Sequence, residues 1–320
     1  MRAVRVHSYG GPEVLNVDQV PTPTPGPGEV LVRVAAAGVN FIDIYQRSGQ
    51  YKVPLPWTLG QEAAGVVEAL GEGVSDLQVG QPVAYAMQTG SYAEYAVVPA
   101  WKVVPVPEGV DLKLAAAVML QGMTAHYLAH STYPLKAGET AVVHAAAGGV
   151  GLLLTQLAKL RGATVIGIVS TEAKAALARA AGADLIATYD DFDSVARAQT
   201  GGRGADVVYD SVGQATFQRS IAALRPRGYL ALFGQSSGAV PPFDPQILNS
   251  SGSLFLTRPT LAHYTLTREE LLWRAGDLFD LIASGKLSVR VDRSYPLDEA
   301  GAAQTALASR ETSGKVLLIP

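Results

Sequence analysis

Cysteine is missing from this sequence of 320 residues, and its absence excludes several kinds of chemistry. Without cysteine there can be no disulfide bond, no iron–sulfur cluster, no cysteine nucleophile and no zinc site built from thiolates. Long apolar runs are also missing, because no uninterrupted stretch reaches the roughly 18 residues of a membrane-spanning helix. The sequence therefore predicts a protein without a membrane span.

Concentrated positive charge is absent too. The chain has 25 Lys and Arg against 28 Asp and Glu, a net charge of −3, and no basic cluster of the kind that binds nucleic acid. The N-terminal stretch MRAVRVHSYGGPEVL alternates like a strand and has neither the apolar stretch nor the cleavage site of a signal peptide. We therefore expect a cytoplasmic protein whose partners are small molecules.

The chain is about twice as long as a typical domain, and its character changes near Leu120. Up to that point short strands and turns are expected, and the four prolines between Pro21 and Pro27 predict an extended surface segment. This first part is predicted to be mainly β. Its candidate strands are Val30–Ala36, Ala63–Leu70, Pro82–Ala86 and Tyr92–Val98.

After Leu120 apolar runs alternate with helical segments, a pattern typical of a doubly wound parallel sheet. The expected strands are Thr140–His144, Thr164–Val169, Leu185–Thr188, Asp206–Asp210, Tyr229–Phe233 and Ser253–Leu256. The expected helices are Val150–Arg161, Glu172–Ala181, Phe192–Gln199 and Thr216–Leu224. A long helix over Arg268–Ser284, a short helix near Asp298–Ser309 and a last strand at Lys315–Ile319 should follow, and this tail could rejoin the first part of the chain.

The strongest motif is TAVVHAAAGGVGLLLTQLAKLRGATVIGIVS, which runs from Thr140 to Ser170. In it Ala146, Gly148 and Gly151 occupy the small-residue positions of G-x-G-x-x-G, with a strand before them and a helix and strand after them. Small side chains let backbone N–H groups approach a pyrophosphate at the positive end of the helix. The motif predicts a dinucleotide site; a tight turn without a ligand is the alternative.

The end of the second strand of this motif indicates which dinucleotide is bound. A ribose 2′-hydroxyl is usually held by an acid at this position, but here the strand ends in Ser170 and Thr171, followed by Lys174. This set suits the 2′-phosphate of NADPH better. Glu172 would repel that phosphate unless it points outward, and Lys174 could also be an ordinary exposed lysine.

Several motifs together make the whole chain resemble the zinc-free quinone oxidoreductases, or zeta-crystallin family, of the medium-chain dehydrogenases/reductases. They are GGPEVL from Gly10, GVNFIDIYQRSG from Gly38, AAAGGVG from Ala145, VVYDSVG from Val207, FGQSSG from Phe233, TRP from Thr257 and SRETSGKVLLIP from Ser309. The resemblance implies an α/β protein with a GroES-like, mainly β catalytic domain over residues 1–122 and 260–320. A Rossmann domain with a doubly wound parallel sheet would bind NADPH over residues 123–259, and a homodimer is usual.

The resemblance also implies where the cofactor binds. The nicotinamide end would contact Tyr127 and the segment Asn40, Phe41, Ile42, Asp43, Ile44 and Tyr45. The pyrophosphate would lie at Gly148, Gly149 and Val150, and the adenosine phosphate among Ser170, Thr171, Lys174, Tyr189 and Arg310. Phe233, Gln235, Ser236, Ser237 and Leu261 would lie along the nicotinamide. Two residues depart from the family pattern, since Gln235 replaces an Asn and His126 replaces a Tyr that is often found there.

No metal site is expected. Related zinc dehydrogenases have Cys and His ligands where this chain has Asn40 and Gln61, and Glu62 alone cannot hold a catalytic zinc. Without a Lewis acid, a substrate that is already electrophilic, such as a quinone, is the natural acceptor of reducing equivalents from NADPH. Candidates to line the acceptor pocket are Asn40, Tyr45, Tyr51, Gln61 and Thr124. None of them is assigned as a general acid, and the two tyrosines could simply pack.

Two other functions stay open at this point. An NADPH-dependent alkenal or enone reductase would use the same fold to reduce an activated C=C bond, with Tyr51 as a possible proton donor. A non-catalytic role is the other alternative, because similar proteins include lens crystallins and RNA-binding proteins. The net negative charge and the intact cofactor motif weigh against this last hypothesis.

Overall fold

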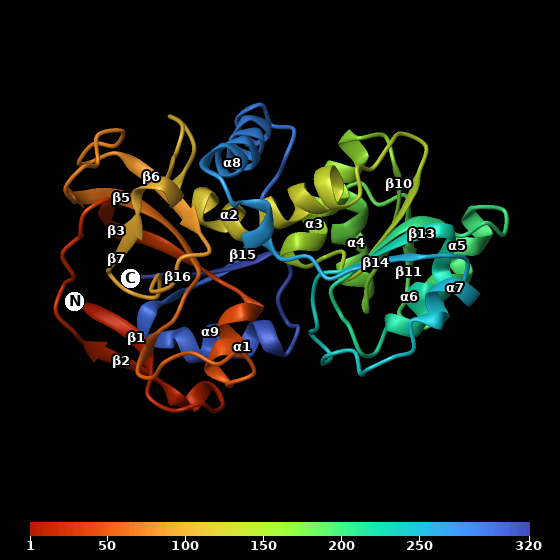
Figure 1. The fold of residues 1–320 in the computed structure, drawn as a ribbon, viewed down its shortest axis with the longest axis horizontal. Helices are drawn as coiled ribbons and strands as arrows, with labels where there is room; N and C mark the ends of the chain where they lie inside the picture. Colours follow the sequence, from red (N-terminus) through yellow and green to blue (C-terminus); the bar gives the residue numbers. More distant parts are fainter. The chain divides into compact units, whose positions relative to one another are not determined.

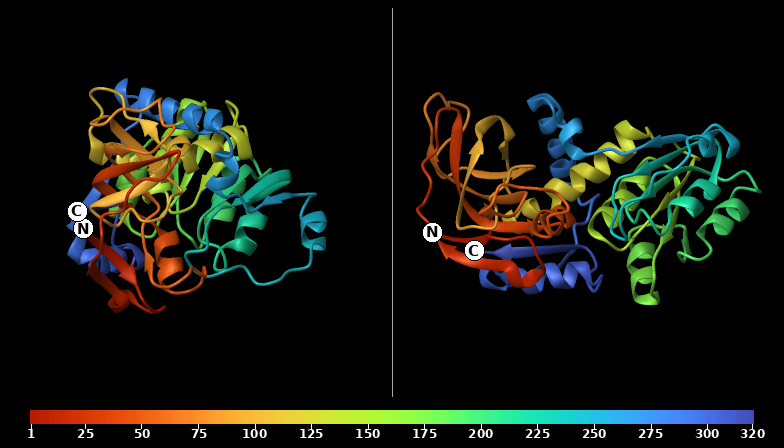
Figure 2. Two further views of the ribbon diagram at one scale, coloured as in Figure 1. Left: turned by 60° about the vertical axis from the view of Figure 1, so that its left-hand side comes forward. Right: turned by 60° about the horizontal axis from the view of Figure 1, so that its bottom comes forward.

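The computed structural model describes all residues from 1 to 320 and divides them into two compact units. The terminal unit is made from both chain ends, Met1–Met123 and Thr265–Pro320, and the central unit is Thr124–Tyr264. Both chain termini lie close together in the terminal unit, as the two views of Figure 2 show. No helix is long and apolar enough to cross a membrane.

The central unit is built on a six-stranded sheet with the order β11-β10-β9-β12-β13-β14, in which every neighbouring pair is parallel. Its strands are β9 (Thr140–Val143), β10 (Thr164–Ile168), β11 (Leu185–Ala187), β12 (Ala205–Asp210), β13 (Leu224–Leu232) and β14 (Phe255–Thr257). The chain moves outward from β9 to β11 and then crosses back to β12. Dinucleotides bind at the carboxyl ends of the strands beside such a switch point.

Helices cover this sheet on both sides, with α3 and α4 on one side and α5, α6 and α7 on the other (Figure 1). They are α3 (Gly149–Leu160), α4 (Glu172–Ala180), α5 (Phe192–Gln199), α6 (Phe217–Ala223) and α7 (Gln246–Ser250). The strands of the middle of the sheet are buried on both faces, with Val142, Ile166 and Val208 fully covered. The predicted doubly wound parallel sheet is confirmed.

The terminal unit contains a seven-stranded sheet with the order β15-β16-β3-β5-β6-β8, and β7 also pairs with β3. Its strands are β3 (Glu29–Val39), β5 (Glu62–Leu70), β6 (Pro82–Ala86), β7 (Tyr95–Pro99), β8 (Val104–Pro105), β15 (Val291–Pro296) and β16 (Lys315–Ile319). A smaller sheet joins β1 (Arg2–Val6), β2 (Leu15–Gln19) and β4 (Trp57–Thr58). Because β16 pairs antiparallel with β3, the C-terminal strand rejoins the N-terminal part of the chain as expected.

The terminal unit also holds helices that the sequence did not reveal. Its helices are α1 (Phe41–Arg47), α2 (Leu112–Tyr127), which runs on into the central unit, α8 (Arg268–Ala283) and α9 (Ala300–Ala308). We expected only strands and turns before Leu120, and this was wrong for α1 and α2. Helix α2 is buried along its length from Ala115 and has no polar face, so it lacks the amphipathic period by which a helix is recognised. Helix α1 spans only seven residues and depends on a capping box between Asn40 and Asp43.

Candidate functional site

The phosphate-binding loop of the central unit connects β9 to α3. Gly148 is the N-cap of α3 and has no side chain with which to cap it, so the first N–H groups of the helix remain for an anion. Gly151 lies against the backbone, where a Cβ would collide with the carbonyl oxygen of Ala145 and lie 2.8 Å from the Cα of Ala146. Ala145 itself has a positive φ of 47°. The loop is therefore closely packed backbone, as a pyrophosphate site requires.

His144 and Asp210 pair at the carboxyl ends of β9 and β12, and sequence reasoning missed both. They are fully buried, with His144 Nδ1 3.3 Å from Asp210 Oδ1. Asp210 accepts hydrogen bonds from the N–H groups of Val212 and Gly213 and from the hydroxyls of Thr216 and Ser220, at 2.7–3.0 Å. Burial raises the pKa of Asp210, but His144 and these donors outweigh burial and hold the pKa well below its ordinary value. The strand end VVYD in the sequence was the only available signal.

The residues expected around the adenosine phosphate stand at the ends of the two neighbouring strands, β10 and β11. Ser170 and Thr171 are exposed, and Thr171 caps α4 by accepting from the Lys174 N–H at 3.3 Å. Tyr189 follows β11, and its hydroxyl accepts from the Ala145 N–H at 3.2 Å. Since β9, β10 and β11 are adjacent and parallel, these groups share one edge of the sheet with the phosphate loop.

Glu172 forms an ion pair within its own helix, α4. Its carboxylate accepts a hydrogen bond from Nη1 of Arg179, which lies seven residues further along α4, and both side chains are exposed. The carboxylate is thus paired with a cation on its own helix.

The segment after β13 contains Phe233, Gln235, Ser236 and Ser237, all half-buried. Its backbone is pinned to the loop after β12, since the N–H groups of Phe233 and Ser237 donate to the carbonyls of Asp210 and Val212 at 2.8 and 2.9 Å. The Ser237 hydroxyl donates to the Val212 carbonyl and accepts from the Ala215 N–H. Ser237 therefore links the loop after β13 to the loop after β12.

Aromatic rings gather where α2 passes into the central unit. Tyr127 is buried and stacks on Tyr264 with ring centroids 4.3 Å apart, and Leu261 and Thr124 are buried as well. His126 is fully buried and stacks on His130 at 4.1 Å. The sequence left open whether His126 has a role or only packs or faces solvent, and in the structure it is buried against His130. These residues sit beside a π-helical turn, Leu128–Thr132, which often marks a functional site.

In the terminal unit the strand ends bring Asn40, Glu62 and Lys315 together. All three are buried, with exposed fractions of 5%, 0% and 1%. Asn40 Nδ2 donates to Glu62 Oε1 at 2.8 Å, and Lys315 Nζ donates to Asn40 Oδ1 at 2.9 Å and to Glu62 Oε1. Glu62 Oε2 accepts from the Leu120 N–H at 2.6 Å. Sequence reasoning named Asn40 and noticed Glu62, but it had no signal for Lys315.

A second buried carboxylate, Asp43, lies one turn further along α1. Its Oδ2 accepts from the Asn40 N–H and from the Tyr92 hydroxyl, both at 2.9 Å, while Oδ1 is buried without a partner. Burial raises the pKa of Asp43 to about 7, although these two donors and the charge of Lys315 oppose it. Burial also raises the pKa of Tyr92 well above its ordinary value, and the Asp43 carboxylate adds to this. Asp43 is thus fully buried and supports Asn40 by accepting its backbone N–H.

The remaining candidates of this unit differ in exposure. Gln61 is buried and donates from Nε2 to Gln46 Oε1 at 3.3 Å. The Tyr45 ring contacts the ring of the exposed Tyr51 edge-on at 5.3 Å, and Phe41 lies 6.1 Å from Tyr45. The side chains of Ile42 and Ile44 are half-buried, and Arg310 is exposed just after α9 with a φ of 61°. Packing thus accounts for part of what the two tyrosines do.

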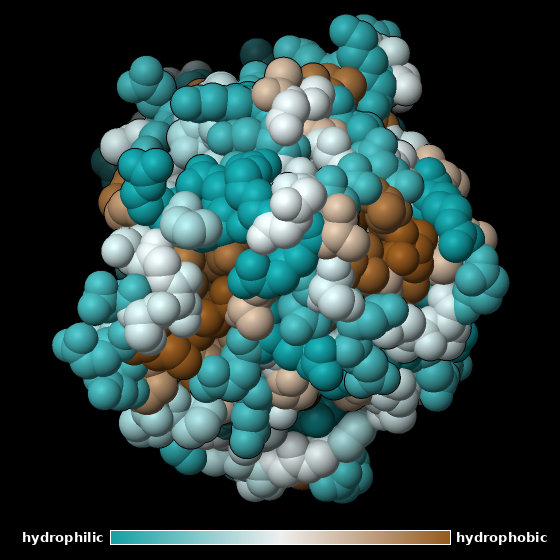
Figure 3. Space-filling model, turned by 90° about the vertical axis from the view of Figure 1, so that its right-hand side faces the viewer, coloured by the Kyte–Doolittle hydropathy of each residue, from teal (hydrophilic) through white to brown (hydrophobic).

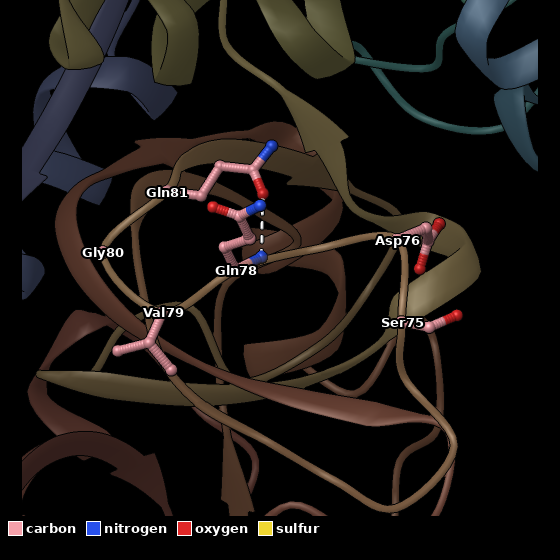
Figure 4. Close-up of a pocket in the computed structure, with 6 residues that line it drawn as sticks. All are labelled: Ser75, Asp76, Gln78, Val79, Gly80 and Gln81. Atoms are coloured by element: carbon pink, nitrogen blue, oxygen red, sulfur yellow. Dashed lines mark hydrogen bonds between the residues drawn. The ribbon is translucent and has the colours of Figure 1, made fainter.

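One open hollow lies apart from all of these residues. It is lined by the loop residues Ser75, Asp76, Gln78, Val79, Gly80 and Gln81 (Figure 4). The Gln78 N–H donates to Gln81 Oε1 at 2.9 Å inside the loop. Its single carboxylate, Asp76, is paired with Arg268 at 3.2 Å, and the lining has no histidine or lysine to activate the Ser75 hydroxyl.

Two family models match different parts of the chain. The family model described as "Alcohol dehydrogenase GroES-like domain" matches residues 26–108, and that described as "Zinc-binding dehydrogenase" matches residues 149–275. Quinone oxidoreductase 1 of Escherichia coli is 45% identical over 99% of both chains, and the quinone oxidoreductase of Pseudomonas aeruginosa is 46% identical over 100% of this chain and 99% of its own.

Solved structures and a further relative extend the comparison. A structure of Escherichia coli quinone oxidoreductase complexed with NADPH is 44% identical, covers both chains completely and has a TM-score of 0.98. A Burkholderia protein named 2-haloacrylate reductase is 43% identical over 99% of this chain and 98% of its own.

Proposed function

We propose that this chain, which belongs to the quinone oxidoreductase family of the medium-chain dehydrogenases/reductases, is an NADPH-dependent quinone reductase. The premise is full-length identity of 44–46% to quinone oxidoreductases, one of them solved with NADPH. The structural observation that carries the proposal is the phosphate loop, which lies at one edge of a parallel sheet. The neighbouring strand β10 ends without an acid that could bind a ribose hydroxyl.

The central unit provides the binding of NADPH. The N–H groups of Gly149 and Val150, at the start of α3 where the helix dipole is positive, would hold the pyrophosphate. Ser170, Thr171, Lys174 and Tyr189, at the ends of β10 and β11, would hold the 2′-phosphate. NADPH supplies the reducing equivalents, so the protein's task is to hold it in one orientation and to exclude competing acceptors.

The terminal unit provides the environment of the acceptor. A quinone accepts a hydride readily because its ring is already electrophilic, and its oxygens need only hydrogen bonds as negative charge develops. Asn40, Tyr45, Tyr51 and Gln61 are proposed to line this site. Tyr51 is the most accessible hydroxyl of the set, with 39% of the residue exposed. The overall reaction combines NADPH, a proton and the quinone to give NADP⁺ and the hydroquinone.

A zinc ion does not fit these residues, despite the name of the matching family model. No group of three or more His, Cys, Asp and Glu side chains gathers anywhere in the structure. At the place of the catalytic zinc in related dehydrogenases, Asn40 and Gln61 offer amides, and the carboxylate of Glu62 already faces the ammonium of Lys315. We expect elemental analysis of the purified protein to find less than a tenth of an equivalent of zinc, and activity lost on chelation would contradict this.

Assembly as a cytoplasmic homodimer is part of the same proposal. β14 is the edge strand of the central sheet, and Phe255 on it is 49% exposed while its ring stacks on Tyr229 at 4.6 Å. Apolar patches stand among polar side chains on the face seen in Figure 3. Edge strands are rarely left uncovered, so β14 is expected to pair with its two-fold mate. Light scattering at micromolar concentration should give twice the 33.5 kDa chain mass, and a monomer would reject this part.

A panel of acceptors tests the function itself. NADPH oxidation should be fast with a benzoquinone or naphthoquinone and at least tenfold slower, in kcat/KM, with an α,β-unsaturated ketone or 2-chloroacrylate. The comparisons do not favour reduction of C=C bonds, although one relative carries that activity in its name. The opposite order of acceptors would replace the proposal by the reductase of activated double bonds, and no turnover with any acceptor would leave the non-catalytic alternative.

A further inference from the structure

Asp210 is the last residue of β12, and its buried carboxylate collects hydrogen bonds from the segment that follows. Oδ1 accepts from the N–H groups of Val212 and Gly213 at 2.8 and 3.0 Å. Oδ2 accepts from the hydroxyls of Thr216 and Ser220, both buried and both at 2.7 Å. Both ends of the loop between β12 and α6 are therefore tied to one residue that water does not reach.

This loop in turn holds residues 234–238, the segment that follows β13. The Ser237 N–H donates to the Val212 carbonyl at 2.9 Å, and the Ser237 hydroxyl donates to the same carbonyl at 2.7 Å. Gly213 approaches the segment so closely that a Cβ on it would lie 2.7 Å from the Gly238 carbonyl oxygen. Because the two stretches of backbone are in direct contact, the conformation of the loop determines where residues 234–238 lie.

The strand order indicates which half of the cofactor meets this segment. With the pyrophosphate at the loop after β9, the 2′-phosphate would lie at the ends of β10 and β11. In a doubly wound sheet the two halves of a dinucleotide lie on opposite sides of the switch point. The sheet has β10 on one side of β9 and β12 on the other, followed by β13. The nicotinamide half would therefore extend over the carboxyl ends of β12 and β13, where the loop and residues 234–238 begin.

We propose that Asp210 is a positioning residue for the nicotinamide half of NADPH, because it fixes the loop after β12 and, through that loop, residues 234–238. This inference rests on the proposed function and deepens it. Asp210 has no exposed surface, so it acts through the loop. An asparagine can keep the same bonds, since its oxygen accepts from the two N–H groups and its amide donates to the two hydroxyls. The Thr216 hydroxyl then donates to the Gly213 carbonyl, which lies 3.2 Å away.

Two ligands that differ in length test the proposal. NADPH spans the whole site, whereas adenosine 2′,5′-bisphosphate has only the adenosine half with its 2′-phosphate. Asp210→Ala should raise the Kd of NADPH by about tenfold or more and that of the bisphosphate by less than about threefold, measured by titration calorimetry. Asp210→Asn should restore NADPH binding to within about threefold of wild type. Equal losses for both ligands, unchanged NADPH binding in a folded Asp210→Ala, or an Asn variant as weak as the Ala variant would overturn the proposal.

A double variant serves if Asp210→Ala does not fold. Thr216→Val with Ser220→Ala leaves the carboxylate in place but removes both donors to Oδ2, so NADPH should bind about three- to tenfold more weakly and the bisphosphate as in wild type. Ser250→Ala is the matched control, since its hydroxyl donates to the Ile247 carbonyl within α7, and it should change neither Kd. Wild-type NADPH binding in the double variant contradicts the positioning role. These measurements need no acceptor, so they decide the role of Asp210 even if no quinone is reduced, whereas wild-type turnover tests the proposed function.

Discussion

The two units present their functional groups by different physical means. The central unit offers the ends of parallel strands, a glycine loop and the start of a helix, so that backbone N–H groups do most of the binding. The terminal unit offers a buried set of charged and amide side chains contributed by residues 40, 62 and 315. A site made from backbone tolerates changes of side chain but not of shape. A site made from buried charges depends on every partner being present.

The shape of the phosphate loop is the feature whose loss should cost most. In Gly151→Ala the new methyl collides with the Ala145 carbonyl oxygen, and the loop backbone has to move by about an ångström. A misplacement of that size can cost about a hundredfold. We expect kcat/KM to fall by about a hundredfold with NADPH and NADH alike, measured by steady-state kinetics.

Gly276→Ala is the matched control for that loss. Gly276 lies within α8, and a Cβ there would meet nothing within 4 Å. Replacing a helical glycine by alanine stabilises a helix by about 0.5–1 kcal/mol. Activity should stay at the wild-type value while the Tm rises slightly. Equal activities of the two variants would show that the loop does not bind the cofactor as proposed.

The side chains of the central unit should matter for one cofactor only. Charge-assisted hydrogen bonds to a phosphate contribute about 1.5–3 kcal/mol each. Lys174→Ala should therefore weaken NADPH use by about ten- to a hundredfold and leave NADH use nearly unchanged. Lys113→Ala, an exposed lysine near the start of α2, is the control and should change neither. A wild-type preference for NADH would show that the 2′-phosphate residues are assigned wrongly.

The terminal unit should respond to pH through Asp43. Its pKa is about 7 in the folded protein and near 3.8 in an exposed carboxyl, so folding favours the protonated form. The stability from Asp43 is fully present below about pH 4 and is lost as the pH rises through 7. Asp43→Asn is neutral at every pH, so its Tm relative to wild type should rise by a few degrees between pH 5 and pH 8.

Differential scanning calorimetry at several pH values measures that difference. Glu13→Gln removes an exposed carboxylate and serves as the control over the same range. A Tm difference for Asp43→Asn that is constant with pH would mean that Asp43 is ionised throughout.

Local sequence was sufficient for the central unit because each of its functional elements is contiguous. The strand, glycine loop and helix from Thr140 to Leu160 follow one another along the chain, and hydrophobic period and small residues identify each of them. Right-handed crossovers between parallel strands place the connecting helices on the faces of the sheet, but the strand order came from the structure. His144 and Asp210 escaped notice because they are 66 residues apart and polar residues at strand ends have many uses.

The sequence alone thus determined the parallel sheet, its phosphate loop, the absence of thiolate metal sites and the preference for small-molecule partners. Only the tertiary structure placed Lys315 against Glu62, which lies 253 residues away, and brought both against the Asn40 side chain. It also revealed that α2 is a helix buried from Ala115 onward. The physical reason is the same in both cases: periodicity reports contacts between near neighbours in the chain, while sheet pairing and burial depend on segments that meet only after folding.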